Sequence, residues 1–232
     1  CLSERFADYP VIRVDSDTMS NRQAMPKLIE QLNNAEPVLL VGTQMLSKGH
    51  HFPHVTLVGI VDADALLFSP DFRGEERLLQ LLTQVGGRAG RAEKPGSVLV
   101  QTRQPEHALI RDLHAPYHEQ LATLLYYRAQ SELPPYGALG VIRCDSKNRQ
   151  AGLAFLQTIK EQVTPPSTCR IIGPLPAAMA RRKDRYRSQL IVAGPSRPPL
   201  AALMASLVEQ AEAARQSSNL GWSVDIDPYE SL

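Results

Sequence analysis

Short apolar runs alternate with amphipathic segments through the first half of the chain, and this alternation limits the folds it can adopt. Four runs are typical of strands: "YPVIRVD" (9–15), "EPVLLVGT" (36–43), "HVTLVGIVDAD" (54–64) and "GSVLVQT" (96–102). The second and third are nearly continuous in hydrophobicity, as in strands buried on both faces. Apolar residues at helical spacing predict helices over 20–34, with Ser20 as the cap, and over 74–85. Strands alternating with helices predict a doubly wound parallel sheet.

The periodicity changes near residue 115, where we predict a second domain. A long helix over 117–132 leads into "LPPYG". The elements expected after it are a strand (138–145), a helix (148–163), two strands (168–173 and 185–193), a helix (198–217) and a strand (222–227). This order is βαββαβ, a small split α/β sandwich. The prediction is an α/β protein with domains over 1–115 and 116–232.

Composition excludes several classes of protein. The 232 residues are 43% hydrophobic with a formal net charge of +1, which suits folded domains rather than a disordered chain. The three cysteines, Cys1, Cys144 and Cys169, form no CxxC pair, which argues against a zinc module or a disulfide framework. This cysteine usage fits a reducing cytosol, so we expect a cytoplasmic protein. No apolar run reaches membrane-spanning length and no signal peptide is evident. Because the chain starts at Cys1, we expect it to be a piece of a longer protein.

The stretch "LLTQVGGRAGRAEKPG" (81–96) follows the predicted helix 74–85 and carries the strongest chemical signal. Gln84, Arg88 and Arg91 are spaced i, i+4, i+7 and would share one stripe of a helix. The intervening glycines remove bulk, so that a phosphate or another backbone can approach. Guanidinium groups bind phosphate oxygens as a fork and can neutralise charge during phosphoryl transfer. The alternative is a glycine-rich helix end with solvated arginines.

The QxxGRxGR pattern resembles the sixth motif of superfamily 2 helicases, which ends their second RecA-like domain. The segment "VGTQMLSKGHHFPHV" (41–55) resembles their fifth motif. Further blocks are similar to one family of bacterial replication-restart helicases, PriA or primosomal protein N′, in the right order: "DFRGEERLLQLLTQVGGRAGR", "LPPYGALGVIR", "GPLPAAMARRKDRYRSQ" and "VDIDP". The resemblance covers essentially the whole chain and implies a RecA-like helicase lobe followed by the small α/β domain.

The resemblance implies roles for the sixth-motif residues. Arg91 matches the arginine finger that reaches the γ-phosphate of ATP, bound with Mg²⁺ on another lobe. Arg88 matches its companion, and Gln84 matches the residue that bridges the nucleotide and the cleft between lobes. The residues that match the fifth motif, which couples the nucleotide site to the DNA strand, are Gly42, Thr43, Lys48 and Gly49. Many relatives have an aspartate where this chain has His51, so the role of that acid does not transfer.

The "GHHFPH" segment could suggest a metal site, because His50, His51 and His54 lie close together in sequence. No Cys, Asp or Glu accompanies them at ligand spacing, and the two adjacent histidines of an extended segment point in opposite directions. We interpret the segment as a loop that faces DNA or a cleft, and predict no metal site in this chain.

The stretch "ARRKDRYRSQLIVAG" (180–194) is the strongest local cluster of charge. If 185–193 is a strand, its period of two places Arg185, Arg187 and Gln189 on one face, and Leu190 and Val192 towards the core. Such a basic face suits nucleic-acid phosphate or an acidic peptide tail. The alternative is a solvated basic hairpin.

By resemblance, Arg185 and Gln189 fall where PriA proteins receive the acidic, aromatic C-terminal tail of single-stranded-DNA-binding protein. The candidate DNA contacts are Arg181, Arg182, Lys183 and Arg187. Trp222 could stack on a base, but a tryptophan beside a strand is more often part of a core.

Two features of a complete helicase are missing from this sequence. There is no GxxxxGK[ST] phosphate loop and no DExx motif for Mg²⁺, and we interpret "VDAD" (61–64) as structural. The main nucleotide site is therefore expected on another lobe, and the chain alone should bind nucleotide weakly and be inactive. The zinc-binding cysteines and N-terminal DNA-binding domain of the family would also lie elsewhere.

Two hypotheses remain. The first is a piece of a monomeric, ATP-dependent 3′–5′ DNA helicase that remodels stalled forks and initiates primosome assembly. The partners it implies are branched and single-stranded DNA, the tail of single-stranded-DNA-binding protein and primosome loading factors, with no membrane. The second is a stand-alone nucleic-acid- or protein-binding module without ATPase activity.

Overall fold

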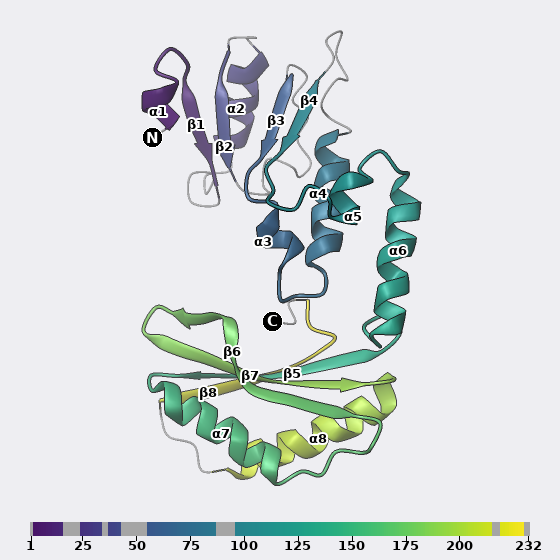
Figure 1. The fold of residues 1–232 in the computed structure, drawn as a ribbon. Coiled ribbons are helices and arrows are strands. Elements are labelled where there is room, and N and C mark those ends of the chain that lie inside the picture. The colour runs from purple at the N-terminus through teal and green to yellow at the C-terminus, as the bar shows by residue number, and fades with distance from the viewer. Residues whose placement is uncertain are drawn as a thin grey trace. The chain divides into compact units, whose positions relative to one another are not determined.

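The computed structural model describes residues 2–15, 24–33, 37–42, 55–86, 96–214 and 219–229 (Figure 1). The chain divides into two compact units. Unit 1 comprises Cys1–Phe68 and Gly74–Tyr117, and unit 2 comprises Ser69–Arg73 and His118–Leu232. The predicted domain limits, 1–115 and 116–232, remain a prediction. Nothing in the periodicity of the first half indicates that a five-residue segment within it belongs to the second unit.

Unit 1 contains parallel strand pairs, as the alternation of strands and helices predicted. Strand β1 (Val11–Val14) pairs in parallel with β2 (Leu39–Gly42), and α2 (Ala24–Asn33) connects them. Strand β3 (Leu57–Ile60) pairs in parallel with β4 (Ser97–Val100). The helices α3 (Asp64–Leu67) and α4 (Gly74–Gly86) lie between these two strands in the chain. Among the described residues the two pairs are separate two-stranded sheets. Two short helices, α1 (Leu2–Arg5) and α5 (Ala108–Arg111), complete the unit.

The expectation that β2 and β3 are buried on both faces is wrong for this structure. Val41 on β2 is 36% exposed and Leu57 on β3 is 58% exposed. Parallel strands become fully buried only when other elements cover both faces of their sheet. The described residues give each of these strands one neighbouring strand and only partial cover.

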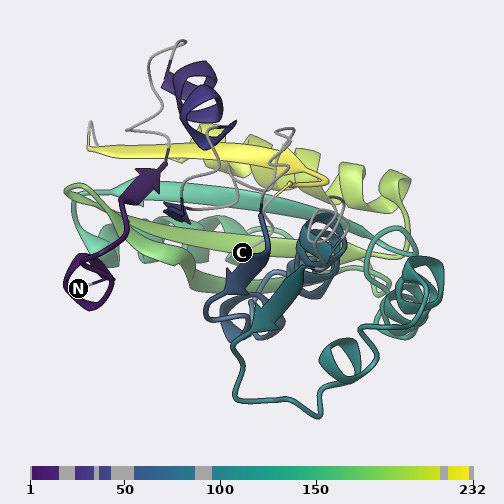
Figure 2. The ribbon, with the colours of Figure 1, turned by 90° about the horizontal axis from the view of Figure 1, so that it is seen from above.

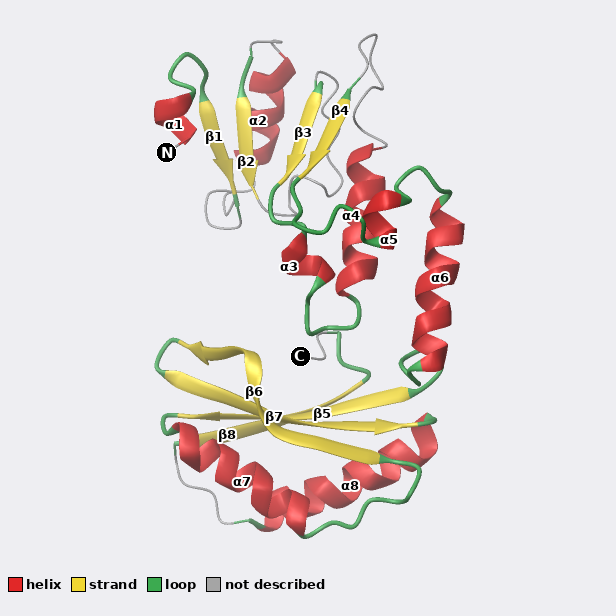
Figure 3. Cartoon of the chain, viewed as in Figure 1, coloured by secondary structure: helices red, strands yellow, loops and turns green. Residues whose placement is uncertain are grey.

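Unit 2 has the predicted βαββαβ order. Its elements are β5 (Ala138–Ser146), α7 (Arg149–Glu161), β6 (Arg170–Arg182), β7 (Arg185–Gly194), α8 (Arg197–Ala213) and β8 (Leu220–Ile226). The strands form one antiparallel sheet in the order β6-β7-β5-β8, so β5 lies between β7 and β8 (Figure 2). Helices α7 and α8 both cover the same face of this sheet (Figure 3). The long helix α6 (Tyr117–Gln130) precedes β5.

The core of unit 2 lies between the sheet and these two helices. Alternate residues of the central strands, such as Ile142 on β5 and Leu190 and Val192 on β7, are fully buried against Leu207 and Met204 of α8. Trp222 of β8 packs at the margin of this core, as predicted for a tryptophan beside a strand. The inward direction predicted for Leu190 and Val192 is therefore confirmed.

Strand β6 is longer than the predicted 168–173. Strand β6 continues through Pro174 and Pro176, because it is an edge strand, where proline costs no ladder hydrogen bond on the open side. Its register shifts between Ile172 and Leu175, where Gly173 has a φ of +106°. A Cβ at Gly173 would lie 2.9 Å from the backbone oxygen of Gln189, so glycine is required for this close approach.

Candidate functional site

Helix α4 presents Gln84 on its exposed side. The apolar residues Leu78, Leu82 and Val85 form a buried stripe at i, i+4, i+7, and Glu75 and Glu76 favour the helix N-terminus. Gln84 lies outside this stripe and is exposed. The buried stripe therefore determines which side of α4 packs against the rest of unit 1. The amide of Gln84 lies on the exposed side, where a ligand could reach it.

The sixth-motif arginines lie outside the described residues, as do Gly87 and Gly90. The spacing prediction that joins Gln84 to Arg88 and Arg91 therefore stays a prediction. Gly86 is described, and an added Cβ there would meet no described atom within 4 Å. That these glycines clear space for a ligand stays a prediction.

Gly42 is the only described member of the predicted fifth-motif set. It is the last residue of β2 and pairs with Val14 at the end of β1, so the carboxyl ends of both strands meet at this edge. Ligands of open α/β sheets bind at such carboxyl ends. Asp15, which directly follows β1, is nearly buried there and pairs with Arg13. The residues that lie outside the described part are Thr43, Lys48, Gly49, His50, His51 and His54.

The "VDAD" segment has a structural role in the part of the chain that is described. The carboxylate of Asp64 accepts hydrogen bonds from the Thr102 hydroxyl and, at 2.9 Å, from the backbone N–H of Arg103. These two bonds, the hydroxyl first, lower the pKa of Asp64. Because Asp64 follows β3 and Thr102 follows β4, the carboxylate joins the ends of these two paired strands.

The basic cluster forms a β-hairpin at the end of β6 and the start of β7. Arg181, Arg182, Lys183 and Asp184 are exposed, and Lys183 has the positive φ of 54° that the tight turn requires. The predicted cluster divides between two sides of the hairpin. Arg181 pairs with Tyr186 and lies over its ring, 5.5 Å from the centroid, on the side where α7 and α8 pack.

A small cavity of about 130 Å³ lies on that same side of the hairpin. Its walls come from α7 and from both strands of the hairpin: Arg149, Leu153, Pro176, Ala180, Arg181, Tyr186, Arg187 and Ser188. The lining combines three arginines with apolar side chains.

Arg185, Arg187 and Gln189 alternate along β7 with the core residues, so the prediction that they share one face agrees with the strand register. Nη2 of Arg185 donates to the backbone oxygens of Asp145 (2.7 Å) and Asn219 (3.1 Å). Nε of Arg187 lies 3.4 Å from Oδ1 of Asp145. Arg185 therefore ties the end of β5 to the segment that enters β8, a structural role that the sequence did not reveal.

Gln189 is far less accessible than a basic binding face would suggest. Its side chain is 1% exposed, and its Nε2 has no acceptor within the described part of the chain. A buried amide without a partner costs about 1–3 kcal/mol, so an acceptor brought by a ligand would stabilise it. The period of two identified the face of Gln189 but could not show that this face is covered.

Within the described residues, no group of three His, Cys, Asp or Glu side chains is placed to hold a metal ion. Among the same residues, no helix is long and apolar enough to cross a membrane.

The fold and the residues of these sites define a helicase-type C-terminal lobe joined to a small α/β domain. Two family models match these parts: the helicase conserved C-terminal domain over residues 1–93, and the primosomal protein N C-terminal domain over residues 129–229.

Curated relatives match both parts together. Replication restart protein PriA of Haemophilus influenzae is 37% identical over 232 residues, covering 99% of this chain and 32% of that protein. The protein of the same name from Synechocystis is 44% identical over 199 residues, covering 84% of this chain and 24% of that protein. The Bacillus subtilis protein of that name is 36% identical over 226 residues, covering 94% of this chain and 28% of that protein. The chain belongs to the PriA family and spans about a third or less of the length of these relatives.

Proposed function

We propose that the protein from which this chain comes is an ATP-dependent 3′–5′ DNA helicase that acts in replication restart at stalled forks. The observation that carries the proposal is the match to both family models, together with the exposed Gln84 at the end of α4, directly before the GRxGR residues. Relatives that match nearly the whole chain are named replication restart protein PriA, which supports the same reading.

In this proposal the chain supplies one side of a nucleotide site. ATP and Mg²⁺ bind mainly to another lobe of the protein, because this sequence has no phosphate loop. Arg91 stabilises the charge that develops on the γ-phosphate, Arg88 supports it, and Gln84 bridges the nucleotide and the lobe. Gly42, at the carboxyl end of β2, and the fifth-motif residues that follow it in the sequence connect the nucleotide site to the DNA strand.

Replacement of the arginine finger in the full-length protein tests this proposal. We expect Arg91→Ala to lower DNA-stimulated ATP hydrolysis by about 10³-fold, because removal of such a finger has that effect in related phosphoryl transfers. Binding of a forked DNA should change little. The matched control is Arg5→Ala, because Arg5 is an exposed arginine on α1 of the same unit. Hydrolysis by Arg91→Ala at the rate of the control would exclude the finger assignment.

We propose that unit 2 binds the acidic, aromatic tail of a single-stranded-DNA-binding protein through Arg185 and Gln189. Two observations support this. The Nε2 donor of Gln189 is buried without an acceptor, and Arg185 and Arg187 lie on the same strand face. A carboxylate-rich tail would give that donor an acceptor and the arginines a counter-charge. The exposed tip of the hairpin, from Arg181 to Lys183, is the proposed DNA contact.

Fluorescence anisotropy with an acidic peptide that ends in an aromatic residue tests the tail site. We expect Gln189→Leu and Arg185→Ala each to weaken binding by about tenfold or more, since bonds to charged groups contribute about 1.5–3 kcal/mol. Arg170→Ala is the control, because Arg170 is an exposed arginine at the opposite end of β6. Arg185 also donates hydrogen bonds to the backbone oxygens of Asp145 and Asn219, so its replacement could destabilise the fold. The affinity of Arg185→Ala is therefore interpreted only if its thermal unfolding midpoint matches that of the control. Unchanged affinity in Gln189→Leu would exclude the tail site.

A further inference from the structure

Residues Ser69–Arg73, here called loop 69–73, belong to unit 2 although the chain on both sides of them belongs to unit 1. The loop directly precedes Gly74, the first residue of α4. Gln84 lies ten residues further along the same helix, about 15 Å away at 1.5 Å per residue. The loop therefore links unit 2 covalently to the helix that carries a proposed nucleotide-coupling residue.

The tip of the loop is an aromatic residue that packs on the sheet of unit 2. Phe72, together with Leu133, contacts a cluster of buried residues on the sheet face opposite to α7 and α8: Leu139, Val141, Ile191 and Ala193. Two guanidinium groups flank its ring. The Cζ atom of Arg73 lies 4.3 Å from the ring centroid, and that of Arg128, on α6, lies 4.8 Å away. Each such cation–π contact adds to the apolar contact that the ring makes with the sheet.

The loop is held in one conformation by its own hydrogen bonds. The backbone N–H of Asp71 donates to the Ser69 hydroxyl at 3.2 Å, and that of Arg73 donates to Oδ1 of Asp71 at 3.0 Å. Asp71 is buried. A loop with these internal bonds transmits a displacement of its tip better than a freely jointed segment of the same length.

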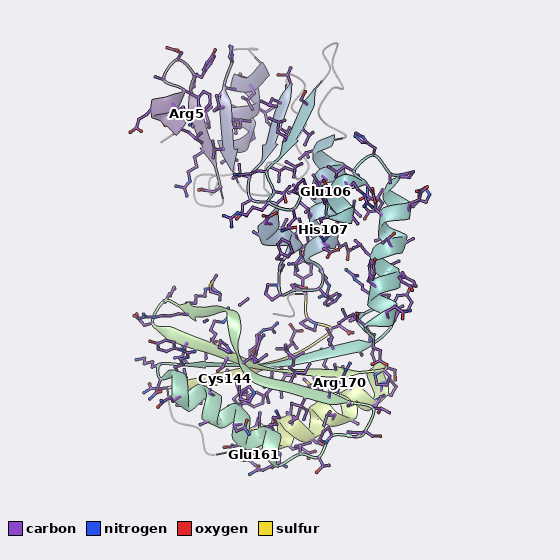
Figure 4. All side chains as sticks on the ribbon, viewed as in Figure 1. Arg5, Glu106, His107, Cys144, Glu161 and Arg170 are labelled. Carbon is purple, nitrogen blue, oxygen red and sulfur yellow. The ribbon has the colours of Figure 1, made fainter. Side chains whose placement is uncertain are left out.

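The two ends of the loop are held in unit 1 by one residue. His107 caps the N-terminus of α5 (Figure 4), and its ring meets Phe68 edge-on at 6.4 Å between centroids. Its Nε2 lies 3.8 Å from a carboxylate oxygen of Glu75, in the first turn of α4. Phe68 directly precedes the loop and Glu75 follows it by two residues, so His107 contacts the chain on both sides of the loop.

We infer that loop 69–73 is a tether through which unit 2 controls α4, with Phe72 as its positioning residue. A partner that shifts the sheet of unit 2 moves Phe72, and the loop passes this movement to the first turn of α4. The inference rests on the proposed function in that α4 matters for ATP hydrolysis only if Gln84 and the residues after it serve the nucleotide site. The tether itself rests on the contacts of Phe72.

The test uses the full-length protein with two readouts: the ratio of ATP turnover with and without single-stranded DNA, and hydrogen exchange of the backbone amides of α4. We expect Phe72→Ala to lower the turnover ratio by about tenfold, within the range of allosteric coupling, and to speed exchange in the first turns of α4. Phe72→Leu, which still fills the apolar site, should recover most of both effects. The control is Tyr126→Ala, because Tyr126 is an aromatic residue on α6 that is 61% exposed.

The outcomes separate the tether from the proposed function. If the unmodified protein shows no DNA stimulation, the helicase proposal fails, and hydrogen exchange alone then decides on the tether. If exchange in α4 is the same for Phe72→Ala and Tyr126→Ala, the tether is wrong. Should Phe72→Ala fail to fold, Arg128→Ala replaces it, because this change removes one stacking group and leaves the apolar site filled. A wild-type turnover ratio together with wild-type exchange in Arg128→Ala would likewise overturn the inference.

Discussion

The two units bury their apolar residues to different degrees. In unit 1 each described strand has four residues, and large apolar side chains such as Leu57 and Leu99 remain exposed. In unit 2 the strands have seven to thirteen residues, and one continuous core contains fully buried Leu190 and Leu207. Segments with few buried apolar contacts open more readily, and moving functional elements are drawn from them. The described strands of unit 1 are therefore expected to open more readily than the sheet of unit 2.

The largest expected difference in the free energy of unfolding is between a core variant of unit 2 and a strand variant of unit 1. Leu207→Ala removes a fully buried side chain from unit 2 and should lower its free energy of unfolding by about 2–5 kcal/mol. Leu57→Ala in β3, where the side chain is 58% exposed, should change it by less than about 0.5 kcal/mol. Urea unfolding is followed by far-UV circular dichroism, which reports both units, and by the fluorescence of Trp222, the single tryptophan, which lies in unit 2. Equal shifts for the two variants would contradict the contrast in packing.

A pair of glycine substitutions sharpens the same contrast. A Cβ at Gly140 of β5 would lie 2.8 Å from Sδ and 3.1 Å from Cγ of Met204, so Gly140→Ala should destabilise unit 2 by about 1–3 kcal/mol through overpacking. At Gly59 of β3 an added Cβ meets no described atom within 4 Å, and Gly59→Ala should stabilise the strand by about 0.5–1 kcal/mol. Thermal unfolding of both variants provides the comparison. Destabilisation by Gly59→Ala would show that unit 1 is packed as tightly as unit 2.

The smallest expected effect concerns a buried thiol of unit 2. Burial is the main cause that raises the pKa of Cys144 to about 11, and the neighbouring Asp145 adds to it, while Arg185 opposes it. The thiol is therefore protonated at pH 8 and should react slowly with iodoacetamide. Because the folded-state pKa is above the unfolded value near 9, its stabilising contribution is complete below pH 9 and is lost as the pH rises towards 11. Cys144→Ala should flatten this part of the stability profile. Rapid alkylation at pH 8 would show that the thiol is accessible.

Much of this fold could be predicted because its signals are local. The apolar spacing of α4 and the alternation along β7 identified both elements and the inward direction of Leu190. The short helices α1, α3 and α5 have four residues each and give no periodic signal. The full length of β6, which passes through Pro174 and Pro176, was not predicted, since a sequence does not reveal that a strand lies at a sheet edge where proline is tolerated.

The site was harder to predict because it depends on contacts distant in sequence. The burial of Gln189 and the hydrogen bonds of Arg185 to Asp145 and Asn219 come from strands that meet only after folding. Phe72 was missed for the same reason. The only signal was an aromatic residue between two charged residues in "PDFRGE", directly before an amphipathic helix.

The central claim of the proposal is that this chain supplies one side of a nucleotide site and by itself binds ATP weakly, if at all. The direct measurement is a titration of the chain 1–232 and of the full-length protein with a fluorescent ATP analogue and Mg²⁺. The account predicts saturable binding by the full-length protein and none by the chain up to about 1 mM, which corresponds to a binding free energy weaker than about −4 kcal/mol. Micromolar binding by the chain 1–232 would contradict the claim, because the phosphates would then be held by residues of this sequence.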